Sequence, residues 1–117
     1  MIRRLLCLTL SLMPAAALAQ NTPVVFVHGL NSDASTWQQA ADHFGRSLAI
    51  TPYLPDLSWS ARYEEQSSDL QQRFQNLPSS TIAVAHSNGG LVSRDWNRSH
   101  QLSGLVTVGT PHAGAPL

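Results

Sequence analysis

The sequence has no lysine, a single cysteine and few charged residues, and each shortage excludes a class of protein. Arginine supplies all seven basic residues, and the formal net charge is zero. Without a basic cluster the chain has no phosphate-neutralising surface, so we predict no nucleic-acid partner. Since Cys7 is the only cysteine, the chain cannot form an internal disulfide.

Long apolar runs are missing as well. Two arginines precede the apolar residues 5–12, which fall short of the roughly 20 apolar residues that span a bilayer. Ala17 and Ala19 then place small residues where a signal peptidase reads. The pattern predicts that residues 1–19 are a signal peptide and that the remainder is exported, secreted or periplasmic. A membrane anchor is the alternative, but we expect no stable transmembrane segment after cleavage.

Residues 20–117 alternate between strand and helix signals. Hydrophobic residues make up 43% of the chain and charged residues 12%, which is typical of a globular domain. Short apolar or β-branched runs predict strands at 24–27, 47–51, 81–85 and 105–108, and apolar residues at helical spacing predict helices between them. This alternation predicts an α/β fold, a three-layer sandwich around a mostly parallel sheet.

Local signals set the boundaries of these elements. Ser35 and Gln38 resemble a capping box at the start of the first helix, and Gly45 is expected to end that helix. Pro52 is expected to close the second strand, and residues 52–61 to form a loop because they are rich in proline, serine and aromatic residues.

Polar or glycine-containing stretches lie just past the ends of three of the predicted strands. They comprise residues 28–30, Ser87 and residues 110–112. Ligand sites in parallel sheets gather at the carboxyl ends of the strands. We therefore expect these three stretches to meet at one edge of the sheet.

Ser87 lies on the turn between a buried strand and a helix. A serine hydroxyl is a weak nucleophile, so it needs a base and fixed donors for the oxyanion that it creates. A sharp strand-to-helix turn exposes the hydroxyl, and it requires small residues two positions away on either side, where the chain has Ala85 and Gly89. The alternative is an ordinary helix N-cap.

Three motifs together resemble the α/β-hydrolase family. "AHSNGG" resembles its nucleophile elbow, usually G-x-S-x-G, with alanine in the first position. "VVFVHGLNSDASTW" is similar to its oxyanion-hole segment, and "LVTVGTPHAGAPL" to the strand and loop that follow the elbow in many lipases. The resemblance covers residues 23–117 and implies a lipase-like or esterase-like serine hydrolase.

The resemblance also implies roles for individual residues. Ser87 would be the nucleophile, and the backbone N–H groups of Leu30 and Asn88 would hold the oxyanion. His28 would brace the loop after the first strand. The expected substrate is a small-molecule or lipid ester, and no metal or organic cofactor is implied.

Other polar and aromatic residues are weaker candidates for a role in the site. His86 and His112 are alternative bases, although the resemblance implies that His112 is structural. Tyr53 and Trp59 could cover an acyl pocket or simply pack their loop. The residues expected to have no catalytic role are His43 and His100, predicted at the surface, and Asp56 and Asp95, which do not occupy the family's acid position.

The family's triad acid and histidine follow the nucleophile, after later strands. The sequence ends at Leu117, before either is expected. We therefore expect residues 20–117 to be the N-terminal portion of a hydrolase domain, with a sheet truncated after its fourth strand and a hydrophobic edge exposed. A non-catalytic binding protein on the same scaffold, or an acyltransferase with the same nucleophile, are the alternatives.

Overall fold

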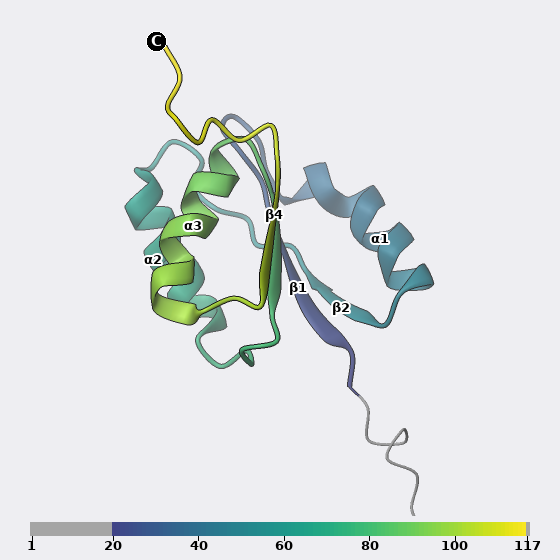
Figure 1. Cartoon of the computed structure of the whole chain (residues 1–117). Helices are drawn as coiled ribbons and strands as arrows, with labels where there is room; N and C mark the ends of the chain where they lie inside the picture. Colours follow the sequence, from purple (N-terminus) through teal and green to yellow (C-terminus); the bar gives the residue numbers. More distant parts are fainter. Residues whose placement is uncertain (1–19, 117) are drawn as a thin grey trace, which may run out of the picture.

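Strands and helices alternate along residues 20–116, the part of the chain that the computed structural model describes (Figure 1). The predicted signal peptide, residues 1–19, lies outside it. All four predicted strands and the helices between them are present. In chain order the elements are β1 (Thr22–Val27), the 3-10 helix η3 (Ala34–Trp37), α1 (Gln38–Ser47), β2 (Ile50–Tyr53), α2 (Tyr63–Phe74), β3 (Ile82–His86), α3 (Asn88–His100) and β4 (Gly104–Val108).

The four strands form one parallel sheet in the order β2-β1-β3-β4. In this register Val24 lies beside Pro52 on one side and Ile82 on the other. Each parallel pairing needs a crossover connection, which the intervening helices provide. Figure 1 shows α1 on one side of the sheet and α2 with α3 on the other. The predicted α/β fold with a parallel sheet is confirmed.

The centre of the core is β1, whose residues 23–27 are all buried. Because successive side chains of a strand point to opposite faces, β1 contributes to two clusters. Val25 and Val27 pack with residues of α2 and α3, whereas Val24 and Phe26 pack with Ala41 of α1. Burial on both faces explains the continuous apolar run of this strand.

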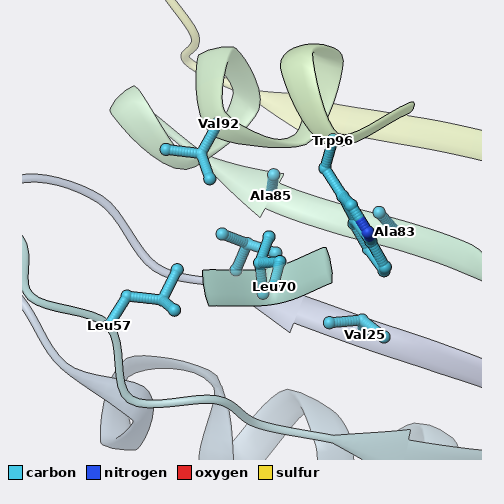
Figure 2. Packing of buried hydrophobic residues seen from close by; sticks show 8 residues of the cluster. Val25, Leu57, Leu70, Ala83, Ala85, Val92 and Trp96 are labelled. Carbon is cyan, nitrogen blue, oxygen red and sulfur yellow. The ribbon is translucent and has the colours of Figure 1, made fainter. Parts of the chain in front are cut away.

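Trp96 is the largest fully buried side chain among the described residues. Figure 2 shows it reaching from α3 toward the sheet, near Ala83 of β3. Small alanines on the strand leave room for the indole, and its Nε1 donates a hydrogen bond to Gln71 Oε1 at 3.0 Å. Leu57, from the loop after β2, is 4% exposed and completes the same cluster.

An apolar surface is exposed along β4, at the edge of the sheet. The register places Val106 beside Val84, so the two share the face of the sheet that carries α1. Val106 and Val108 are 53% and 49% exposed. Among residues 20–116, β4 therefore has an exposed apolar face.

The predicted boundaries of the first helix are wrong. Asp33, not Ser35, is the N-cap: its side chain accepts the N–H of Ser35 at 2.8 Å, and the first turn is a 3-10 helix. Asp33 is a stronger cap than Ser35 because its carboxylate carries a full negative charge, and a charged acceptor forms a stronger hydrogen bond with a free N–H than a hydroxyl does. Gly45 does not end α1, which continues to Ser47.

The second and third strands also differ from the prediction. Pro52 lies inside β2 rather than closing it, and β2 spans residues 50–53 instead of 47–51. This position is tolerated because β2 is an edge strand, where a missing N–H need not interrupt the sheet. β3 begins and ends one residue later than predicted.

Candidate functional site

Ser87 occupies the junction between β3 and α3 in a strained backbone conformation. Its φ is 54° and its ψ is −127°, a combination that costs residues other than glycine about 1–3 kcal/mol. Although Ser87 stands at the N-cap position, its side chain makes no capping hydrogen bond. The ordinary helix-cap alternative is therefore not what the structure contains.

Hydrogen bonds from two directions hold this turn. The N–H of Ser87 donates to the carbonyl of Val108 at 2.9 Å, and its own carbonyl accepts from the N–H of Gly90 at 3.0 Å. The same carbonyl also accepts from Thr110 Oγ1 at 2.9 Å. The end of β4 and the loop after it thus over-determine the strained backbone, which is how such conformations persist. The sequence did not indicate this role for Val108 and Thr110.

Glycines bring the three strand ends together. A Cβ on Gly89 would lie 2.6 Å from the carbonyl oxygen of Val27, so only glycine lets α3 start directly against the end of β1. A Cβ on Gly29 would lie 2.9 Å from Ser87 Cβ and 3.5 Å from the backbone nitrogen of Asn88. The loop after β1 therefore lies against the turn at Ser87, as the expected meeting of strand ends requires.

The backbone N–H groups of Asn88 and Leu30 are the two oxyanion donors expected from the sequence. Asn88 is the first residue of α3, so its N–H has no partner within the helix. Within residues 20–116, neither this N–H nor that of Leu30 donates to a backbone carbonyl. The dipole of a 13-residue helix adds a partial positive charge at this end. The arrangement can hold negative charge near Ser87.

His28 braces the loop after β1, as the resemblance implied. The residue is 1% exposed, its Nε2 accepts the N–H of Leu57 at 2.9 Å, and its Nδ1 lies 3.1 Å from the carbonyl of Gly29. An acceptor at Nε2 and a carbonyl beside Nδ1 require the neutral form protonated on Nδ1. Both nitrogens are therefore engaged, and neither is available to Ser87.

Solved structures of hydrolases match the chain in three dimensions. The mature form of lipase BlEst2 from Bacillus licheniformis is 28% identical with a TM-score of 0.64, and the match covers 80% of this chain and 42% of the lipase. An extracellular α/β-hydrolase from a Paenibacillus species is 22% identical with a TM-score of 0.66, covering 82% of this chain and 42% of that one. The pyrethroid hydrolase PytH is 15% identical with a TM-score of 0.63, covering 75% of this chain and 39% of that one.

The chain has the α/β-hydrolase fold. It spans less than half the length of these three relatives. No protein-family model matches the sequence, and no curated protein matches it either. The predicted resemblance to α/β-hydrolases is confirmed at the level of the fold.

The remaining histidines of this α/β-hydrolase fold lie in different surroundings. His112, an alternative base, is held by Arg94 Nη1 at 3.2 Å from Nδ1 and by Thr107 Oγ1 at 3.1 Å from Nε2. It therefore ties the loop after β4 to α3. His86 ends β3 and is exposed, and His43 is exposed on α1.

His100 differs from its prediction as a surface residue. It is half-buried at the end of α3, where its ring stacks on Trp96 with centroids 5.0 Å apart. Its Nε2 is buried without a hydrogen-bond partner among the described residues. Helical spacing placed His100 four residues after Trp96, which was the available signal for this contact.

The loop after β2 contributes packing and polar contacts. Tyr53 belongs to β2, and its ring packs edge-on against that of Phe74 with centroids 5.5 Å apart. This contact favours a packing role for Tyr53 over a role in covering an acyl pocket. Trp59 is 42% exposed. Asp56 Oδ1 accepts the N–H of Ala34 at 3.2 Å. Asp95 lies on α3, where its Oδ1 is 3.8 Å from Arg98 Nη1.

A cavity of about 540 Å³ opens beside α3 and does not include Ser87 among its lining residues. Its walls come from the start of α2, the outer face of α3 and the loop after β4, and include Tyr63, Leu91, Arg94, Asp95, Asn97, Arg98, Pro111, His112 and Gly114.

Among residues 20–116 no group of three or more histidine, cysteine or acidic side chains is placed to hold a metal ion. In the same part of the chain, no helix has the length and apolarity needed to cross a membrane.

Proposed function

We propose that this chain carries the nucleophile and oxyanion hole of a serine hydrolase that cleaves carboxylic esters. The observation that carries the proposal is the conformation of Ser87: a strained, positive-φ serine at a strand-to-helix turn, with a side chain that does not cap the helix. Strain of this kind is typical of functional sites. The named activities of the structural relatives, a lipase and a pyrethroid hydrolase, support ester substrates.

In the proposed reaction, the Ser87 hydroxyl attacks the ester carbonyl and an acyl-enzyme forms while the alcohol leaves. The N–H groups of Asn88 and Leu30 hold the tetrahedral oxyanion. Water then attacks the acyl-enzyme and releases the acid. Loss of one such donor typically costs about 3–4 kcal/mol of transition-state stabilisation, so the backbone at positions 30 and 88 matters as much as the hydroxyl.

Proton transfer in this scheme needs a histidine, and we assign none within residues 20–116. His28 and His112 each have both ring nitrogens engaged by other groups. We propose that the triad acid and histidine belong to residues outside this range, in accord with the greater length of the structural relatives. Export through residues 1–19 and a small-molecule or lipid ester as substrate are part of the same proposal.

The hydroxyl of Ser87 can be tested with a fluorophosphonate probe, which phosphonylates an activated serine. The protein is expressed with all the sequence that its gene encodes, and intact mass and peptide mapping locate the label. We expect one label on Ser87, none in Ser87→Ala, and an unchanged label in Ser68→Ala, which alters an exposed serine of α2. Hydrolysis of a short-chain nitrophenyl ester should follow the same pattern.

A non-catalytic binding role is the second candidate. It is favoured by the engagement of His28 and His112 away from Ser87. An unlabelled Ser87 in a correctly folded protein, together with no ester cleavage, would exclude the hydrolase and leave this role. Product analysis with added alcohols separates a hydrolase from an acyltransferase, because only the latter transfers the acyl group mainly to the alcohol.

A further inference from the structure

The loop that carries Leu30 is held at both of its ends by two consecutive residues, Asp56 and Leu57. These two residues lie in the loop after β2, nearly thirty positions along the chain from His28. We call them the 56–57 clamp. The loop that they hold, residues 28–33, joins β1 to η3 and contains Asn31 at a left-handed φ of 49°.

Leu57 holds the first end of this loop. Its N–H donates to His28 Nε2 at 2.9 Å, and the opposite side of that ring faces the carbonyl of Gly29. The leucine side chain is 4% exposed in the cluster that contains Val27, so its backbone has little freedom to move. The position of His28 is thereby fixed relative to the core.

Asp56 holds the second end. Its Oδ1 accepts the N–H of Ala34 at 3.2 Å, at the first residue of η3. The carbonyl of Asp56 accepts from Arg73 Nη2 at 3.2 Å, which anchors the aspartate to α2. Asp56 Oδ1 also lies 3.8 Å from His28 Nε2. Since that nitrogen already accepts the N–H of Leu57, this approach is not an ion pair of a neutral histidine.

We propose that Asp56 is a positioning residue that fixes the Leu30 N–H for oxyanion stabilisation. The inference rests on the proposed function, because it assigns Leu30 the second donor. An oxyanion donor acts only when its geometry is set before the reaction, and an error of about 1 Å can cost on the order of 100-fold in rate. Residues 29–33 lie between the two anchored residues, His28 and Ala34, so loss of the bond to Ala34 gives the segment that contains Leu30 more freedom.

The test compares Asp56→Ala with Asp56→Asn in the full-length protein. Asparagine keeps an oxygen that can accept the N–H of Ala34, whereas alanine removes it. Asp42→Ala is the matched control, because it also removes an exposed carboxylate, here one whose hydrogen bond goes to Gln38 within α1. The measurements are kcat and KM for a short-chain nitrophenyl ester, and the Ki of an alkyl boronic acid that forms a tetrahedral adduct with serine.

We expect Asp56→Ala to lower kcat by about tenfold and raise the Ki of the boronic acid by a similar factor, with KM unchanged. This is less than the loss of about 100- to 1,000-fold expected when a donor is removed outright. Asp56→Asn and Asp42→Ala should stay within about twofold of the parent protein. The proposal is overturned if Asn is as slow as Ala, if only KM changes, or if Asp56→Ala keeps full kcat.

Amide hydrogen exchange separates this inference from the proposed function. Faster exchange across residues 29–34 in Asp56→Ala, restored in Asp56→Asn, supports the clamp even if Ser87 is never labelled by a fluorophosphonate. Unchanged exchange in Asp56→Ala refutes the clamp even if Ser87 proves to be the nucleophile.

Discussion

Replacing Ser87 with glycine should stabilise the fold while removing the proposed nucleophile. The backbone at φ 54° and ψ −127° lies in a region that glycine adopts without a steric penalty. Relief of about 1–3 kcal/mol of strain is offset by the extra entropy of an unfolded glycine, about 0.5–1 kcal/mol. We therefore expect the free energy of unfolding to rise by about 1 kcal/mol.

The comparison that isolates strain is Ser87→Gly against Ser87→Ala. Both lose the hydroxyl, but alanine keeps the Cβ and with it the strain. Urea unfolding followed by circular dichroism measures the difference, and with an m of about 1.5 kcal/mol per molar the midpoint should shift by about 0.7 M.

Ser68→Gly supplies a control of opposite sign. Ser68 is exposed within α2, where the same substitution should lower stability by about 0.5 kcal/mol because glycine is a poorer helix former than serine. If the Ser87→Gly protein is no more stable than the Ser87→Ala protein, the assignment of strain to this turn is refuted.

Three further predictions concern the turn at Ser87 and the cap at the start of η3. Gly89→Ala should destabilise the protein by about 1–3 kcal/mol in urea unfolding, because the new Cβ would lie 2.6 Å from a main-chain oxygen, whereas Gly45→Ala, with its nearest neighbour at 3.9 Å, should stabilise it by up to about 1 kcal/mol. The Ser35 hydroxyl and N–H hold the pKa of Asp33 below its usual value, so this cap contributes stability above the ordinary aspartate pKa and loses it as the pH falls through the depressed pKa. Ser35→Ala should raise the pKa of Asp33 toward its ordinary value in a carboxyl NMR titration, and an unchanged pKa would contradict this cause. Thr110→Val should cost about 1 kcal/mol in thermal unfolding by removing its hydrogen bond to the Ser87 carbonyl, and no loss would show that this bond does not support the turn.

The sequence predicted the order of elements because β1, β3 and β4 carry clear apolar patterns. The run at residues 24–27 is buried on both faces, and a parallel strand buried on both faces requires a continuous apolar sequence. The convergence of Gly29 and Ser87 was also predictable, since each lies within two residues of the end of a parallel strand.

What the sequence could not supply are contacts between segments that local patterns do not relate. Judged from its neighbours in the sequence alone, Pro52 predicts the end of a strand. It is tolerated inside β2 because β2 is an edge strand, which the local sequence does not reveal. The hydrogen bond from Leu57 to His28 joins residues 29 positions apart, and no periodicity encodes it. The same holds for Thr110, whose partner is the carbonyl of Ser87.

The hydrogen bond between the N–H of Ser87 and the carbonyl of Val108 couples β4 to the candidate nucleophile. Among residues 20–116, β4 pairs only with β3, and Val106 and Val108 on it are exposed. Even a small displacement of β4 would pull on the main chain at position 87. The position of the Ser87 backbone therefore depends on the order of a strand that lies about twenty residues further along the chain.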